Sequence, residues 1–154
     1  MTGDSVVRIV VPPGWGRVTD PVPGVALLMA APRRPATGVL PSMAVAAAPL
    51  SPGRTRAAYL EGLRAELTAR LDDADVEDED SFEVDGGPVD YLRVAHRDDE
   101  RHLISEVWVW LADGRAWSVC GTLDRRDYAD FCDVFEEVAA TFDPERSHPA
   151  HPAA

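Results

Sequence analysis

The stretch SEVWVWLADGRAWSVCGT, residues 105–122, holds three of the chain's four tryptophans and one of its two cysteines. Asp113 and Gly114 at its centre are typical of a two-residue hairpin turn, in which both residues adopt a positive φ. We therefore predict one strand over 103–111 and a return strand over 116–121. A mostly antiparallel sheet is expected around this hairpin.

The turn determines which residues of the two strands lie opposite one another. Trp110 faces Trp117, and Trp108 faces Val119; directly paired residues share a sheet face. One face therefore carries these four side chains, whereas the other carries Val107, Val109, Leu111, Ala116, Ser118 and Cys120. Because both faces are apolar, we expect the hairpin to be covered on both sides, or to keep one face for a partner.

A preceding strand is predicted over 89–96 and is joined to the hairpin by the polar turn RDDE. This turn places Val94 opposite Leu103 and Leu92 opposite Ser105, which adds Val94 and Leu92 to the aliphatic face. The tryptophan face gains Tyr91, Arg93, Ile104 and Glu106. The charged pair on that face is expected to mark a rim or to form an ion pair between strands.

Three earlier apolar runs predict further strands over 6–11, 25–31 and 43–48, and a short strand is placed at 82–84. Turn signals such as DPVPG separate these runs.

Two helices follow from the spacing of apolar residues. The first is predicted over about 53–71, with Ser51 as its N-cap and Pro52 at its first position. The second is capped by Thr122 or Asp124. Their apolar stripes are Leu60, Leu63, Leu67 and Leu71 in the first helix, and Tyr128, Phe131, Phe135, Val138 and Phe142 in the second.

The acidic run DDADVEDED, residues 72–80, carries seven acids in nine residues. It lacks the turn glycine and the spaced ligands of an EF-hand loop, so we interpret it as a solvated linker and predict no metal site. The element order predicts an α+β fold with a central, mostly antiparallel sheet of about six strands and two main helices packed on it. Residues 1–143 are expected to form a single domain, and 144–154 a disordered tail.

Composition excludes several classes of function. The chain has 154 residues and a net charge of −12, with 27 acidic residues against 15 basic ones, all of them Arg. This balance argues against nucleic-acid binding, which requires a basic surface. The absence of Lys excludes a Walker lysine and a Schiff-base lysine. Without a targeting signal or a long apolar run, we expect a cytoplasmic protein that does not insert into a membrane.

No group of residues indicates catalysis. Cys120 has no neighbouring base and no C-x-x-C spacing, so it is interpreted as a buried, unreactive thiol, and both cysteines are expected to stay reduced. His96 and His102 flank the polar RDDE turn and are interpreted as solvated. We therefore predict a protein that is not an enzyme and that needs no cofactor.

Four segments carry a resemblance to a known group: VVPPGWGRV, FEVDGGPVDYLRV, EVWVWLADGRAWSVCGT and FEEVAATF. Over residues 5–143 the chain resembles the Mog1/PsbP-like group, which includes DUF1795 (DcrB-like) and LpqN-like proteins. The resemblance implies a central antiparallel sheet surrounded by helices. It also implies a non-catalytic binding role, since members act as Ran-binding regulators, photosystem subunits, lipoproteins and chaperones that hold apolar segments. The group shares no catalytic residues.

The tryptophan face is the predicted partner-binding surface, comprising Tyr91, Arg93, Ile104, Glu106, Trp108, Trp110 and Trp117. The leading hypothesis is a protein-binding adaptor or chaperone that holds an apolar segment against this face, which could also serve a homodimer. One alternative function is an acidic inhibitor or immunity protein for a basic toxin. Another is a small-molecule-binding protein or an enzyme of unidentified chemistry. In a further interpretation, the tryptophans are core residues beneath one of the helices.

Overall fold

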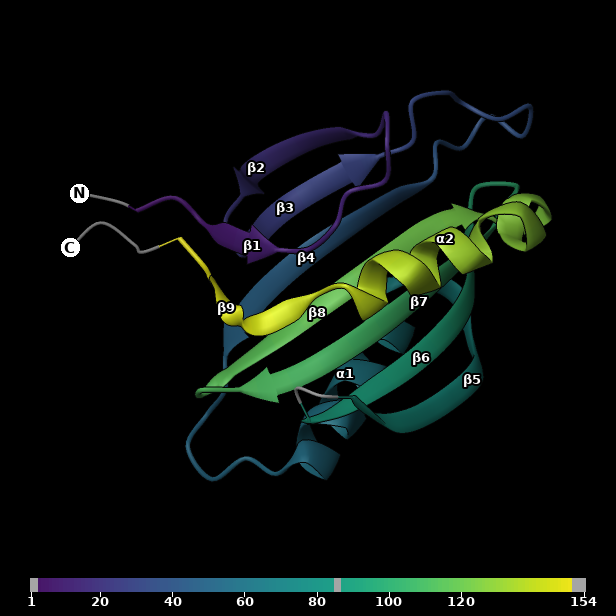
Figure 1. Ribbon diagram of the computed structural model, residues 1–154. Helices are drawn as coiled ribbons and strands as arrows, with labels where there is room; N and C mark the ends of the chain where they lie inside the picture. Colours follow the sequence, from purple (N-terminus) through teal and green to yellow (C-terminus); the bar gives the residue numbers. More distant parts are fainter. Residues whose placement is uncertain (1–2, 85–86, 151–154) are drawn as a thin grey trace.

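The computed structural model of the chain describes residues 3–84 and 87–150. Within these residues, nine strands, two α-helices and one 3-10 turn follow one another (Figure 1). In chain order they are β1 (Val6–Arg8), β2 (Gly16–Val22), β3 (Val25–Ala30), β4 (Ser42–Pro49), α1 (Arg56–Arg70), β5 (Asp72–Val84), β6 (Gly87–Asp98), β7 (Arg101–Ala112), β8 (Arg115–Asp124), the 3-10 turn (Arg125–Asp127), α2 (Tyr128–Ala140) and β9 (Asp143–His148).

The main sheet of the described residues has seven strands in the order β2-β3-β4-β8-β7-β6-β5, and all the neighbouring pairs are antiparallel. The α+β class with two helices on an antiparallel sheet is confirmed, and the predicted number of about six strands is corrected to seven. A separate two-stranded sheet joins β1 to β9. Helix α1 covers one face of the sheet, and α2 lies on the opposite face together with β1 and β9 (Figure 1).

The β7–β8 hairpin has the predicted register. Trp110 lies opposite Trp117, and Trp108 lies opposite Val119. Asp113 and Gly114 both have a positive φ, as a two-residue turn requires. The turn sequence therefore determined how these strands pair.

The register between β6 and β7 differs from the prediction by two residues. Val94 pairs with Ser105 instead of Leu103, because the turn between Asp98 and Arg101 has two residues instead of four. An even shift keeps every side chain on its predicted face, since side chains alternate with a period of two. The composition of the two faces is therefore as predicted.

Strand β5 contains the acidic run, so its interpretation as a linker is wrong. Asp and Glu are uncommon in strands, so the sequence pattern did not predict a strand here. The acids are tolerated because β5 is the terminal strand of the sheet and most of its side chains are exposed. Charged side chains on such an edge also discourage pairing with other chains.

Helix α1 begins later than predicted. Its N-cap is Thr55, whose side-chain oxygen accepts a hydrogen bond from the Ala58 backbone N–H at 3.1 Å. Residues 51–54 instead form a turn in which Gly53 has a positive φ, which a helix does not accommodate. The predicted cap at Ser51 and the helical position of Pro52 are therefore wrong.

Before α2, Asp124 caps the 3-10 turn by accepting a hydrogen bond from the Arg126 backbone N–H at 2.9 Å. Helix α2 itself follows, with Phe135, Val138 and Ala139 buried against the sheet. The aromatic stripe predicted for this helix therefore faces the core.

Residues 144–148 of the predicted disordered tail instead belong to strand β9. Strand β9 pairs with β1, and the Arg8 backbone N–H donates to the Ser147 hydroxyl at 2.9 Å. The Ala150 backbone N–H donates to the Ser5 hydroxyl at 2.7 Å. Residues 151–154 of the predicted tail lie outside the described residues.

In the part of the chain that the structure describes, neither α-helix combines the length and the apolar character needed to cross a membrane.

Candidate functional site

The three tryptophans of the hairpin are core residues. Trp108, Trp110 and Trp117 are 4%, 5% and 1% exposed. Phe142, directly after α2, packs on two of them, with ring centroids 4.8 Å from Trp110 and 5.4 Å from Trp117. The expectation of an open aromatic face is therefore wrong, because α2 and the residues that follow it cover that face. Ile104 is buried in the same way.

The polar residues of the predicted surface form a cluster under the start of α2. Tyr91 and Tyr128 both donate hydrogen bonds to Oε2 of Glu106. Arg93 lies opposite Glu106 in the sheet, but its Nη1 donates to the Tyr128 hydroxyl oxygen at 3.3 Å, and its Nε lies 3.7 Å from Glu77. The predicted pairing of Arg93 with Glu106 is thus replaced by links to Tyr128 and Glu77.

Burial governs the ionisation of Glu106. Desolvation raises the pKa of its carboxyl, and the hydrogen bonds from the two tyrosines and the charge of Arg93 oppose that rise only in part. Among the described residues, Oε1 of Glu106 has no hydrogen-bond partner. Burial, followed by contact with Glu106, also raises the pKa of Tyr91. The cluster ties the start of α2 to the sheet, with Glu106 buried and Tyr91, Arg93 and Tyr128 partly exposed.

A mostly apolar recess lies at the end of the sheet where β2 turns into β3. We call it the apolar groove, and its volume is about 570 Å³. Its side chains are almost all apolar: Pro21, Val22, Pro23, Val25, Ala26, Ala47, Ala48, Pro49, Pro149 and Ala150. Val22 is 55% exposed, so the groove presents a large apolar side chain to the solvent.

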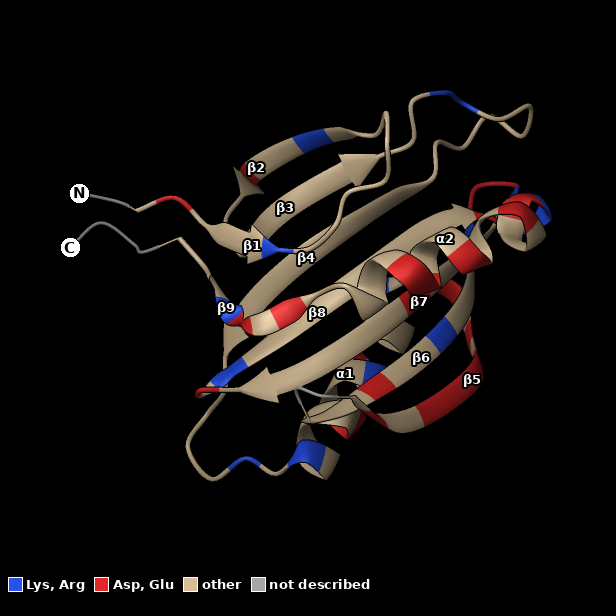
Figure 2. Cartoon of the chain, in the orientation of Figure 1, with Lys and Arg blue, Asp and Glu red and all other residues tan. Residues whose placement is uncertain are grey.

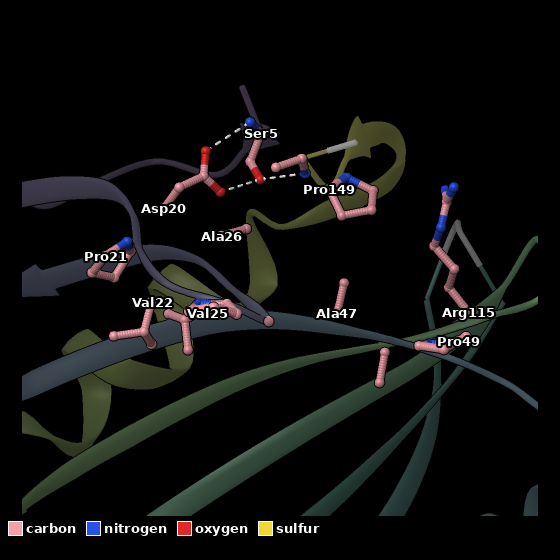
Figure 3. Close-up of a pocket in the computed structure, with 14 residues that line it drawn as sticks. Ser5, Asp20, Pro21, Val22, Val25, Ala26, Ala47, Pro49, Arg115 and Pro149 are labelled. Atoms are coloured by element: carbon pink, nitrogen blue, oxygen red, sulfur yellow. Dashed lines mark hydrogen bonds between the residues drawn. The ribbon is translucent and has the colours of Figure 1, made fainter. Parts of the chain in front are cut away.

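Two polar features mark opposite ends of the apolar groove (Figure 3). At one end the Asp20 carboxylate accepts hydrogen bonds from the Ser5 backbone N–H at 2.9 Å and from the Ser5 hydroxyl at 2.5 Å. At the other end stands Arg115, which makes no ion pair within residues 3–84 and 87–150. The Asp20 end is thus internally satisfied, whereas Arg115 has donors to offer.

Sequence reasoning missed the apolar groove because irregular strand pairing creates it. The pairing of β2 with β3 shifts between Thr19 and Val22, and that of β3 with β4 shifts between Val25 and Leu27. Such bulges bend the strands locally. The apolar turn segment DPVPG was the one sequence signal at this place.

A second recess, which we call the aromatic trough, lies between the end of β5 and the end of α2. It comprises Phe82, Val84, Val89, Trp108, Trp110, Glu136, Ala139, Ala140 and Phe142, with a volume of about 110 Å³. A shallower continuation of about 340 Å³ shares four of these residues and adds Thr141, Asp143, Pro144 and Glu145. Two of the predicted partner-binding tryptophans therefore form part of a recess, although they lie at its bottom.

The histidines and cysteines within residues 3–84 and 87–150 do not form a site. His96 is buried and its Nε2 lies 2.9 Å from the Ser105 hydroxyl, so its interpretation as a solvated residue is wrong. Burial lowers the pKa of His96 and raises the pKa of the Cys120 thiol. Both cysteines are free, with Cys120 on the α1 side of the sheet and Cys132 on α2. Among the described residues, no group of three or more His, Cys, Asp and Glu side chains is arranged to hold a metal ion.

No protein-family model matches the chain, and no curated protein matches its sequence. Solved structures do match it. CyanoP, the PsbP of Synechocystis sp. PCC 6803, matches with a TM-score of 0.64 at 17% identity, covering 93% of this chain and 91% of CyanoP. The chain has a Mog1/PsbP-like fold.

Two further structures share this fold. PA94 of Pseudomonas aeruginosa, a protein of unknown function, has a TM-score of 0.68 at 11% identity, covering 98% of this chain and all of PA94. LpqN of Mycobacterium tuberculosis, which is involved in cell envelope biogenesis, has a TM-score of 0.69 at 12% identity, covering 97% of this chain and 86% of LpqN. At these identities the likeness establishes the fold alone.

Proposed function

We propose that the chain is a non-enzymatic protein-binding module, an adaptor or chaperone, that holds an apolar segment of a partner protein in the apolar groove. The observation that carries the proposal is the groove itself, a recess of about 570 Å³ whose side chains are almost all apolar and partly open to solvent. A concave, mostly apolar recess of this size lies within the range of about 300–1,000 Å³ that is typical of ligand sites. The PsbP-like and LpqN-like folds of the structural neighbours are consistent with a non-catalytic role.

The groove is suited to a segment of protein chain for two reasons. Its floor is formed by paired strands, so a partner would meet a surface that needs little ordering on binding. Full burial of an apolar side chain contributes about 1.5–3 kcal/mol, so covering Val22, which is 55% exposed, contributes roughly half of that. Several such apolar contacts along the groove would bind an apolar segment, and this binding requires no catalytic residue.

The proposal is tested by photo-crosslinking in the source cell. A photoreactive amino acid is placed at Val22, which lines the groove, and separately at Val18, which lies on the same strand but outside the groove. The two positions are equally accessible, at 55% and 53% exposure, so they form a matched pair. We expect a crosslinked partner at Val22 alone, attached through an apolar segment. Equal crosslinking at both positions, or attachment through a charged segment, would contradict the proposal.

A further inference from the structure

The aromatic trough carries a second inference, on a surface separate from the apolar groove. One edge of the trough is formed by Phe82 and Val84 near the end of β5. These side chains remain 39% and 44% exposed. Its opposite wall is the end of α2 together with Phe142, and Trp110 lies at the bottom. Two large exposed apolar side chains thus border a recess whose bulky inner lining, including Trp110 and Phe142, belongs to the core.

The trough has room for one bulky side chain. A cavity needs roughly 10–15 Å³ to hold a single water. The deeper part of the trough, at about 110 Å³, therefore accepts several non-hydrogen atoms, as a leucine or phenylalanine side chain would supply.

The charged residues that line the trough are all acidic. Its charged lining residues are Glu136 at the α2 end and Asp143 and Glu145 at the other end, and no arginine is among the described residues that line it. Asp143 already has a partner, because its Oδ2 lies 3.6 Å from Nε of Arg146. Glu136 and Glu145 are exposed and make no ion pair within the described ranges.

The elements around the trough extend this acidic field. Figure 2 shows acidic residues along α2 and along β5, the helix and the strand whose ends border the trough. The whole chain carries a charge of −12. Such a field attracts a basic partner and raises its association rate.

We propose that the aromatic trough binds a basic segment of a partner protein. One bulky apolar side chain of that segment fills the space between Val84 and Phe142. Arginine or lysine side chains on either side of it reach Glu136 and Glu145. This occupant satisfies both properties of the trough, since a neutral apolar segment would leave the two carboxylates unpaired, and a purely basic one would leave the apolar recess empty.

The proposal is tested by selection from a phage-displayed library of random dodecapeptides against the full chain at low ionic strength. We expect enriched peptides with a bulky apolar residue flanked by Arg or Lys, and affinity that falls as salt is added. Enrichment of neutral or acidic peptides, or a failure to enrich any sequence, would overturn the proposal.

Variants then locate the binding of the selected peptide by fluorescence anisotropy. Glu136→Arg should weaken binding roughly fivefold or more, because it reverses a charge at the trough. Glu137→Arg changes the net charge equally but lies outside the trough, so at about 0.15 M ionic strength, where the Debye length is about 8 Å, it should change affinity by less than about twofold. Equal losses in these two variants would mean that the peptide senses only the overall charge, which overturns the site.

A third variant separates the trough from the apolar groove. Val22→Asp alters the groove alone and should leave the affinity for the basic peptide unchanged. If Val22→Asp abolishes binding of the selected peptide, the peptide occupies the groove and the trough proposal fails, whereas the proposed function stands. Thermal unfolding of each variant close to that of the wild type confirms that the fold is intact.

Discussion

Gly121 of β8 and Phe135 of α2 are in direct contact across the interface between helix and sheet. A Cβ atom on Gly121 would lie 2.5 Å from Cδ2 of the Phe135 ring, which is closer than non-bonded carbon atoms approach one another. The absence of a side chain on Gly121 therefore sets how closely α2 packs on the tryptophan face. Phe135 is completely buried, so its ring has little room to move.

Gly121→Ala should lower the free energy of unfolding by about 1–3 kcal/mol, because the added methyl group displaces Phe135. Urea denaturation measures the loss. The matched control is Gly16→Ala, since Gly16 also lies in a strand and has nothing within 4 Å of the added atom. The control should be neutral or slightly stabilising. A small effect of Gly121→Ala would mean that α2 packs less closely than described.

Glu106→Gln tests the buried carboxyl beneath α2. Burial raises the pKa of Glu106 above its ordinary value of 4.5, so the folded chain holds this proton more tightly than the unfolded chain. The stability that the group contributes is therefore fully present below pH 4.5 and is lost as pH rises through the raised pKa. The variant does not titrate, so relative to the wild type it should become steadily more stable as pH rises.

The measurement is urea denaturation of both proteins from pH 4.5 to mildly alkaline pH. Glu137→Gln serves as the control, because it removes the same charge at an exposed position on α2, the helix that covers Glu106. Parallel profiles for the wild type and Glu106→Gln would show that Glu106 has an ordinary pKa in the folded chain.

The ion pair of Arg56 with Asp90 should fasten the start of α1 to the sheet. Nε and Nη2 of Arg56 donate to the two oxygens of Asp90 at 2.5 and 2.6 Å, and Asp90 is buried. Burial alone would raise the pKa of Asp90, but the hydrogen bonds from Arg56 and Ser81 outweigh it and hold the pKa below 3.8. The resulting stability is present above pH 3.8 and is lost as pH falls through the lowered pKa.

Arg56→Leu should cost about 1–3 kcal/mol at neutral pH, because Asp90 is left buried without its partner, and the partial exposure of Arg56 moderates the loss. Arg70→Leu is the control, since the pair of Arg70 with Glu66 is exposed and 3.7 Å apart. That control should cost less than about 0.5 kcal/mol. Equal losses in urea denaturation would refute a special role for the Arg56 pair.

The central hairpin could be predicted from sequence because its turn is local. Asp113 and Gly114 adopt the positive φ angles that their residue types favour, and the pairing of Trp110 with Trp117 follows directly. The predicted sheet face of each side chain in β6 is correct although the predicted register with β7 is wrong by two residues, since side chains alternate between faces with a period of two.

Long-range and atypical features could not be predicted. Strand β9 pairs with β1, and the hydrogen bond from Arg8 to Ser147 spans 139 residues of sequence. The acidic strand β5 contradicts strand propensity and exists because it lies at the sheet edge. The tryptophans are covered by α2 and Phe142, which fold back over the sheet. The spacing of apolar residues in the sequence does not show which helix covers which face.

The candidate site could be predicted only in part from the sequence. Trp108 and Trp110 do line a recess, but the large apolar side chains that it exposes to solvent are Phe82 and Val84. The apolar groove depends on bulges in β2 and β3, for which the sequence offers no periodic signal.

The central claim, that the apolar groove holds an apolar segment of a partner, is tested most directly by the affinity of the crosslinked partner for two variants. Isothermal titration calorimetry compares Val22→Asp, which places a charge in the groove, with Val18→Asp, which places the same charge outside it on the same strand. We predict that Val22→Asp weakens binding roughly tenfold or more and that Val18→Asp changes it by less than about twofold. Equal affinities of the two variants would contradict the account.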